Sequence, residues 1–379
     1  INAAAMSARA QVMPVPSGPV TPPQVQQECA RFIARMRRRQ QSSSGLDIAK
    51  KTVEIMRQLI GMANVKDVHA LIELIKSVGT TLISAQPHEL AIGNMVRRVL
   101  AIVREESAGG ASLSVGHEGA AGKGPAPAEC SSAGVGPSLI KMLDAPEQPD
   151  YSRKPLKAFK GQMMEAITEL LDELSSESSH IAEQAIEHIH SNEVILTHGH
   201  DPTVESFLRA AHKKRTFQVV VAETVPGGEG RLTAIELAEA GISVTLIGDA
   251  AVFAMMARVN KVIVGAHAVM ANGGLMARAG CHLLALAAQH HAVPVVVCAG
   301  MYKLTPLFPS GPEPFNVLLS PQPMLAYNEG LHEVDVPNPA YDYVPPELIS
   351  LLITNMGGNH ASYIYRLLQQ EYHPDDYDL

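Results

Sequence analysis

The chain has 379 residues, of which 46% are hydrophobic and 18% are charged, and its formal net charge is -8. This length suits two domains with sizeable cores, and the modest negative charge disfavours direct binding to nucleic acid or to an anionic membrane surface. Four widely spaced cysteines form no CxxC pair, which favours free thiols in a reducing cytosol over a zinc site. We therefore expect a cytoplasmic globular protein, and no motif predicts a metal or another cofactor.

The N-terminal part of the chain predicts a tail followed by a helical domain. Residues 1–22 contain many Ala and Pro residues and lack the apolar core of a signal peptide, so we expect a flexible tail. Residues 23–106 hold about four segments with apolar residues at helical spacing, and Pro87 suits the first turn of the last one. No uninterrupted apolar run of membrane-spanning length is present.

The middle of the chain changes composition twice. Residues 107–150 consist mostly of Gly, Ala, Ser and Pro and predict a disordered insert, because they offer too little apolar surface to offset the ordering entropy. Residues 151–190 then carry an apolar stripe through Met163, Ile167 and Leu174. This spacing predicts a long amphipathic helix that connects two domains.

Residues 191–379 predict an α/β domain in which strands and helices alternate. The segments "EVILTHG", "FQVVVAET", "ISVTLIGD", "KVIVGAH" and "VPVVVCAG" are continuous apolar runs, as in strands that are buried on both faces of a parallel sheet. We expect a short strand at 331–337, a helix that begins near Pro346 and a last helix at 361–372. The predicted fold is an N-terminal helical domain followed by a Rossmann-like, doubly wound parallel sheet domain.

Ligands of an open parallel sheet bind beyond the carboxyl ends of its strands, so these ends are the candidate site. The "PGGEG" turn at 226–230 is placed to hold a phosphate, but its spacing is not GxGxxG, and an ordinary loop is the commoner explanation. His198, His200 and Asp201 follow the first strand, yet HxHD without a third ligand is a weak metal signal. These residues alone suggest a sugar-phosphate type of fold and leave its activity open.

Several of these segments together resemble one known family over roughly the last 190 residues. They are "ILTHG", "AETVPGGEGRLTAIELAEAGISVTLI", "DAAVFAMMARVNKVIVGAHAVMANGG" and "AGCHLLALAAQHHAVPVVVCA". The family contains methylthioribose-1-phosphate isomerase, ribose-1,5-bisphosphate isomerase and the alpha, beta and delta subunits of eukaryotic translation initiation factor 2B. The segments "AQPHELAIGNMVRRVLAIVREE" and "YDYVPPELISLLITNMGGNHASYIYRLLQQEYHPDD" are most similar to its beta-subunit branch.

The resemblance also shows where this sequence departs from the isomerases. They carry a catalytic cysteine after "LTH", an acid after "VGA", an arginine in an "ETRP" turn and an aspartate in "NGD". The matching positions here are Gly199, His267, Val225 and Gly274. Glycine supplies no nucleophile or acid, and imidazole does not replace a carboxylic acid. A non-catalytic protein is expected, and an isomerase with a rearranged site or a retained sugar-phosphate or nucleotide sensor site remains the alternative.

The resemblance implies a regulatory subunit of the guanine-nucleotide exchange factor for initiation factor 2. The implied partners are the alpha, delta, gamma and epsilon subunits of initiation factor 2B and the alpha subunit of initiation factor 2, phosphorylated or not. The residues expected to face initiation factor 2 alpha are Gln86, Pro87, Glu89, Asn94, Arg97 and Arg98. The alternative is that Arg97 and Arg98 merely solvate a helix. The residues expected at the contact with delta, where an activator pocket would lie, are His190, Asn192, Val194, Gln218, Val220, Thr245 and Ile247.

Overall fold

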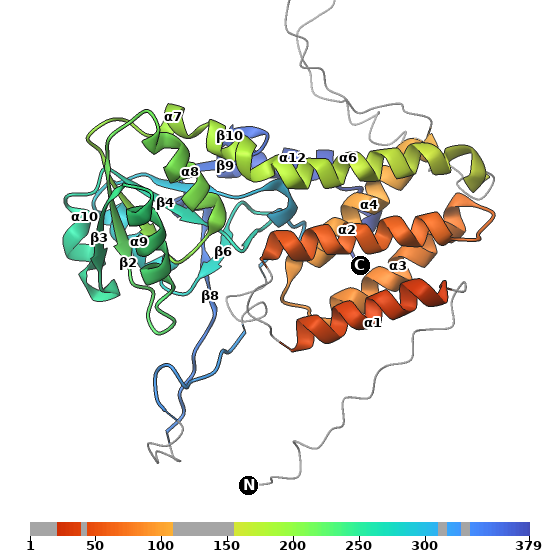
Figure 1. The fold of residues 1–379 in the computed structure, drawn as a ribbon, viewed down its shortest axis with the longest axis horizontal. Helices are drawn as coiled ribbons and strands as arrows, with labels where there is room; N and C mark the ends of the chain where they lie inside the picture. The colour runs from red at the N-terminus through yellow and green to blue at the C-terminus, as the bar shows by residue number, and fades with distance from the viewer. Residues whose placement is uncertain (1–20, 39–43, 109–154, 310–316, 327–333) are drawn as a thin grey trace, which may run out of the picture.

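The computed structural model describes residues 21–38, 44–108, 155–309, 317–326 and 334–379 (Figure 1). Most of the predicted tail and of the predicted insert lies outside these ranges. In Figure 1 a group of long helices stands beside a sheet domain, and one helix runs along both of them.

The helical group is built from amphipathic helices that share one apolar core. Its members are α1 (Pro23–Arg37), α2 (Gly45–Met62), α3 (Val68–Ala85), α4 (Leu90–Ala108) and α6 (Leu156–Glu183). Leu59, Leu71, Leu100 and Met163, from four of these helices, are fully buried together. Pro87 lies in the turn before α4 and not in its first turn, contrary to the prediction. By length and composition α3 would suffice to cross a membrane, but it packs within this core.

The sheet domain contains seven strands in the order β10-β9-β7-β4-β1-β2-β3. The strands are β1 (Val194–His198), β2 (Gln218–Ala222), β3 (Ser243–Ile247), β4 (Lys261–Gly265), β7 (Val295–Cys298), β9 (Leu351–Thr354) and β10 (Gly357–Asn359). Every pair is parallel except β9 with β10. The order runs outward from β1 in both directions, which is the doubly wound arrangement, and the predicted fold class is confirmed.

Helices cover both faces of this sheet because successive side chains of each strand point to opposite sides. Ile195, Val219 and Val221 pack with one helical layer, whereas Leu196 and Val220 pack with the other. The first layer holds α8 (Pro202–His212) and α9 (Glu229–Glu239), preceded by the short α7 (Ala185–His188). The second layer holds α10 (Val252–Met256), α11 (Cys281–His290) and α12 (Ile364–Glu371).

Three features differ from the sequence prediction. Pro346 begins only a single 3-10 turn, and the chain then forms β9, because its apolar residues are buried by pairing with β7. Of the strand expected at 331–337, residues 334–337 form no strand, and the rest lies outside the described ranges. A second, antiparallel sheet of β5 (Ala268–Val269), β6 (Leu275–Arg278) and β8 (Tyr341–Val344) was not predicted. β5 and β6 are very short strands that are neighbours in sequence, and β6 pairs with the distant β8.

The C-terminal segment returns to the helical group and closes on it. The Asp376 carboxylate is fully buried and accepts two hydrogen bonds of 2.8 Å from Arg104, and Lys76 lies 3.1 Å away. Arg97 donates to the carbonyl oxygens of Asp376 and Tyr377 at 3.1 Å each. We name this set of contacts the C-terminal clasp. It ties the end of the sheet domain to α3 and α4.

Candidate functional site

Two of the four isomerase-matched positions meet around Arg278 at the carboxyl ends of the strands. Gly199 ends the β1 segment with φ of 75°, a left-handed conformation that favours glycine. A Cβ there would lie 3.6 Å from Cγ of Arg278. The Arg278 guanidinium stands 5.8 Å from the ring centre of Tyr341, which stacks on His267 at 4.3 Å. Arg278 was missed by the sequence analysis, although it is a lone cation at the end of a short strand.

His267 is a half-buried link between the helical group and the sheet domain. Its Nε2 lies 3.2 Å from the carbonyl oxygen of His88, in the turn between α3 and α4, and so donates to it. Burial lowers the pKa of His267, which keeps the imidazole neutral near neutral pH. The position that matches the isomerases' acid therefore holds a neutral ring engaged in a contact between the helical group and the sheet domain.

The Val225 position lies in a turn that is held by an aspartate. The Asp249 carboxylate accepts hydrogen bonds from the backbone N–H groups of Thr224 at 2.9 Å and Val225 at 2.6 Å. Thr224 in turn accepts from the N–H of Gly199 at 2.9 Å. The "PGGEG" turn leads into α9, where Glu229 forms a 2.9 Å ion pair with Arg278. The Arg278 guanidinium is thus paired with the Glu229 carboxylate, whereas an unpaired guanidinium would attract an anion to this turn.

Gly274 leaves no room for a side chain. A Cβ at this position would lie 2.5 Å from the hydroxyl oxygen of Tyr343, which also accepts a 2.6 Å hydrogen bond from Asn272. An aspartate would require Tyr343 to move. Gly199, Val225, His267 and Gly274 themselves supply no nucleophile, carboxylate or arginine side chain.

A buried ionic group that the sequence analysis missed lies beside these strand ends. Lys303 pairs with Asp201 at 3.0 Å, and although burial alone would lower the pKa of Lys303, the Asp201 carboxylate raises it above its usual value. Glu177 of α6 is also buried, and neither of its oxygens has a hydrogen-bond partner within the described residues. Burial raises the pKa of Glu177 to about 8. No local motif joins these residues, because they come from three distant segments.

The three residues of the HxHD segment point to different surroundings. His198 is buried and lines a pocket, whereas Asp201 pairs with Lys303. Only His200 joins a cluster of possible metal ligands, with Glu205 and Glu236, all ligand atoms lying within 4.8 Å of one another. Arg209 already forms an ion pair with Glu205. The motif therefore does not form a three-ligand site.

The expected initiation factor surface on α4 is largely inside the protein. Asn94 is fully buried and donates to the carbonyl oxygen of Tyr302 at 2.9 Å, and Arg97 is 4% exposed within the C-terminal clasp. Arg98 is half-buried and pairs with Glu371 at 3.2 Å. The prediction is wrong for Asn94 and Arg97, because the chain's own C-terminal half covers them. Of the other expected residues, Pro87 is exposed and the half-buried ones are Gln86 and Glu89.

The residues expected at the delta contact mostly share one side of the sheet. Alternate positions of β1, β2 and β3 face the layer of α10 and α11, and the parallel register aligns Val220 with Thr245. Val220 was expected at the contact, but it is buried beneath this layer and is not accessible to a partner. The members that are exposed or half-buried are His190, Asn192, Val194, Gln218, Thr245 and Ile247.

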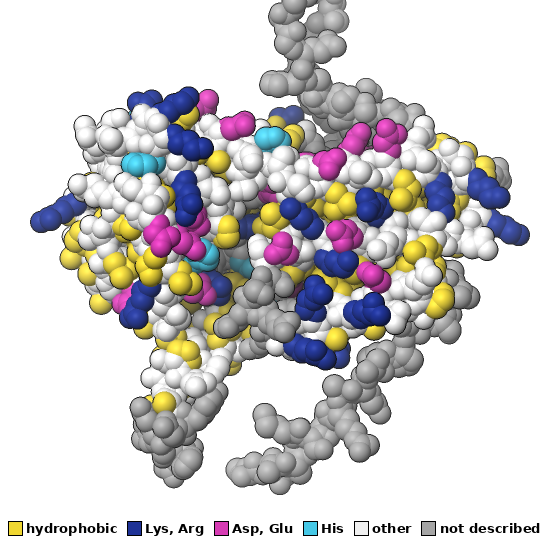
Figure 2. Space-filling model, in the orientation of Figure 1, with side chains coloured by type: hydrophobic (Ala, Val, Ile, Leu, Met, Phe, Trp, Pro, Cys, Tyr) yellow, Lys and Arg dark blue, Asp and Glu magenta, His cyan; other side chains and the backbone are white. Residues whose placement is uncertain are grey.

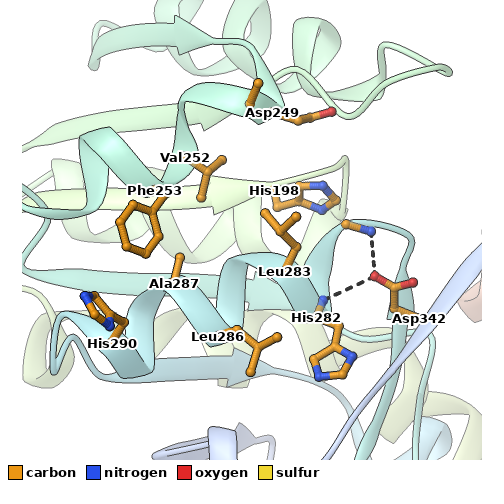
Figure 3. A pocket seen from close by; sticks show the side chains of 12 residues that line it. His198, Asp249, Val252, Phe253, His282, Leu283, Leu286, Ala287, His290 and Asp342 are labelled. Atoms are coloured by element: carbon orange, nitrogen blue, oxygen red, sulfur yellow. Dashed lines mark hydrogen bonds between the residues drawn. The ribbon is translucent and has the colours of Figure 1, made fainter.

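The same side of the sheet carries an apolar hollow of about 740 Å³ between α10 and α11 (Figure 3). Phe253, Leu283 and Leu286 line it with exposed fractions of 52%, 57% and 49%. Asp342 closes one end, where its carboxylate accepts from the N–H groups of Gly280 at 2.6 Å and His282 at 3.3 Å. We call Phe253, Leu283 and Leu286 the α10–α11 face. Contiguous exposed apolar side chains of this kind are typical of surfaces that bind another protein, a ligand or a membrane.

Further exposed apolar side chains surround the β3 edge of the sheet. Leu232 and Ile235 project from α9, and Leu246 projects from β3. Figure 2 shows hydrophobic side chains gathered over this end of the sheet domain, where β2, β3, α9 and α10 lie in Figure 1. On the face drawn in Figure 2, apolar side chains thus gather at the sheet edge, away from the helical group.

Over most of its length the chain is similar to proteins of one known family. The model of the initiation factor 2 subunit family matches residues 41–361. The chain belongs to this family. The beta subunit of translation initiation factor eIF2B from Dictyostelium discoideum is 43% identical over 370 residues, covering 91% of this chain and 95% of the relative. The beta subunit from Schizosaccharomyces pombe is 39% identical over 360 residues, covering 87% and 92%. The expected similarity to the beta-subunit branch of the initiation factor 2 subunit family is confirmed.

Solved structures and a more distant enzyme complete the comparison. The crystal structure of eIF2B beta from Chaetomium thermophilum matches with a TM-score of 0.68 and 26% identity over 94% of this chain and 93% of its own. The tetrameric eIF2B-beta2-delta2 complex of that organism gives the same TM-score over 92% of this chain and 95% of that one. Ribose 1,5-bisphosphate isomerase from Pyrococcus furiosus is 31% identical over 210 residues, covering 54% of this chain and 65% of the enzyme.

Proposed function

We propose that this chain is a non-catalytic regulatory subunit of the guanine-nucleotide exchange factor for initiation factor 2, in the position of its beta subunit. The similarity to beta subunits over nine-tenths of the chain supports the position. Gly199, His267, Val225 and Gly274 support a role without isomerase chemistry, since none supplies the group that the enzymes use. Turnover of ribose 1,5-bisphosphate or methylthioribose-1-phosphate by the purified chain would contradict this part of the proposal.

The observation that carries the proposal is the α10–α11 face. A chain that functions alone would be expected to cover a phenylalanine and two leucines around a hollow, whereas a subunit leaves them for its partner. A relative crystallised as a beta2-delta2 complex supports a delta-type subunit as that partner. We propose that this face and the accessible residues along β1 to β3 pair with delta, and that the assembly further includes the alpha, gamma and epsilon subunits.

Charge substitution on the α10–α11 face is expected to weaken pairing with the delta-type subunit. Phe253→Asp and Leu286→Asp each place a carboxylate where the partner would bury an apolar side chain, and loss of such central contacts weakens interfaces by about 2–4 kcal/mol. We expect dissociation constants at least about thirtyfold higher, measured by sedimentation of the co-purified pair. Leu232→Asp is the matched control, because Leu232 is equally exposed on the opposite helical layer. Unchanged pairing of both face variants would exclude this surface.

Binding of the initiation factor 2 alpha subunit is proposed at the turn between α3 and α4. Gln86, Pro87 and Glu89 remain accessible there, whereas Asn94 and Arg97 do not. Pro87→Asp is expected to weaken binding of the assembled complex to both phosphorylated and unphosphorylated alpha subunit by about tenfold, since an added charge at a docking corner costs about 1–2 kcal/mol. Surface plasmon resonance with both forms measures this. Arg31→Asp on α1 serves as a control, and equal affinities of the Pro87 variant and the unmodified complex would place the contact elsewhere.

A further inference from the structure

A projecting arm precedes β8 and leaves the body of the sheet domain. It consists of residues 317–326 and 334–340 within the described ranges, and Figure 1 shows it extending below the sheet. Its two legs hold each other: Leu319 N–H donates to the carbonyl oxygen of Asn338 at 2.7 Å, and Ala340 N–H donates to that of Val317 at 2.8 Å. We call these residues the arm. The two backbone hydrogen bonds between its legs give the arm an ordered base.

A buried amide reinforces the same base. The Asn338 side chain is only 5% exposed and donates a 2.9 Å hydrogen bond to the carbonyl oxygen of Ser320 in the opposite leg. Beyond this bond the chain turns at Pro321, whose carbonyl oxygen accepts from the N–H groups of Met324 and Leu325. The arm is therefore ordered before it binds, so binding to a partner would cost less conformational entropy.

The arm exposes large apolar side chains that nothing in the described chain covers. Leu318 is 64% exposed and Met324 is 54% exposed, and Leu319 and Val334 are exposed as well. Removing such side chains from water stabilises a contact, because burial of apolar surface is favourable. An element that projects from the body has no neighbouring core of its own, so this gain is available only on contact with another molecule.

The base of the arm adjoins the α10–α11 face. The leg that ends at Ala340 continues directly into β8, whose Asp342 lines the hollow and holds the N–H groups at the start of α11. A subunit seated on the α10–α11 face therefore reaches the base of the arm. The arm and the face form one continuous surface for a single partner.

The charge of this region defines the chemistry of that partner. From residue 304 to residue 365 the sequence contains no Lys or Arg. Among its described residues the stretch holds three acidic side chains, Asp335, Asp342 and Glu347, of which Asp335 and Glu347 are exposed. A surface that is apolar and acidic, without any cation, fits an apolar groove bordered by Lys or Arg side chains.

We infer that the arm is a second docking element for the subunit that covers the α10–α11 face, and that it occupies an apolar groove with a basic border on that subunit. This inference rests on the proposed function, because it assigns the arm to the same delta-type partner. The face supplies the centre of the contact, and the arm extends it along one side of the partner.

The experiment uses the full chain co-purified with the delta-type subunit. The double variant Leu318→Ser/Met324→Ser removes two exposed apolar side chains of the arm, and Gln322→Ser on the same turn is the matched polar control. We expect at least a tenfold higher dissociation constant for the double variant, arising mainly from faster dissociation, and a change below twofold for the control. Asp335→Asn is expected to slow association at low salt and to reduce its salt dependence.

The arm variant and the α10–α11 face variants test the two proposals separately. If Phe253→Asp weakens pairing while the arm variant pairs within twofold of the unmodified chain, the arm inference is overturned and the proposed function stands. If the arm variant weakens pairing and the face variants do not, the arm is supported and the face is excluded. If neither set changes pairing, both proposals fail. An unchanged melting temperature of the isolated arm variant confirms that any loss reflects docking and not unfolding.

Discussion

Asp376→Ala is expected to lower the free energy of unfolding by about 3–5 kcal/mol, because removal of one partner leaves buried charges uncompensated. The carboxylate is fully buried and holds Arg104 through two bonds of 2.8 Å and Lys76 at 3.1 Å. Its loss also releases the segment whose carbonyl oxygens accept from Arg97. Urea unfolding followed by circular dichroism measures the change.

Asp378→Ala provides the control for this prediction. It removes the same charge from the same tail, but Asp378 is exposed, so we expect a change within about 0.5 kcal/mol. Similar stabilities of the Asp376 variant and the unmodified chain would show that the C-terminal clasp does not join the sheet domain to α3 and α4 in solution.

Glu177→Gln is expected to stabilise the protein at pH 8 by a few kcal/mol. Glu177 lies on α6 against Gly300, where a Cβ on the glycine would lie 1.0 Å from Oε1, and its oxygens have no donor within the described residues. Burial raises its pKa from the usual value of 4.5 to about 8. The unfolded chain thus ionises at lower pH than the folded one, and each pKa unit corresponds to about 1.4 kcal/mol.

The sign of this effect sets the pH dependence. The unmodified chain retains its full stability with respect to Glu177 below about pH 4.5 and loses it progressively as the pH rises to about 8. Glutamine does not titrate, so the variant should lack this decline, and the two stabilities should converge at the acidic end. Glu169→Gln on the exposed side of α6 should keep the decline. A parallel pH profile for the Glu177 variant would contradict the buried, protonated state.

The local sequence pattern was sufficient to predict the elements whose burial depends on residues that are close in sequence. The segments at β1, β2, β4 and β7 each contain at least two consecutive buried apolar residues, as expected for strands covered on both faces. The positions of the strand ends, and with them the candidate site, followed from these segments.

Long-range contacts decided the rest. Residues 351–354 were expected in a helix, yet pairing with β7 makes them a strand, since their apolar character fits either element. Arg97 and Arg98 are adjacent cations on a helix, and only the tail some 270 residues later determines that one is buried and the other pairs with Glu371. Likewise Glu177, Asp201 and Lys303 share no motif. The sequence by itself determined which segments are buried and the resemblance to the family. The tertiary structure decided which charges remain accessible, because the partners of buried Arg97, Arg104 and Lys303 come from distant segments.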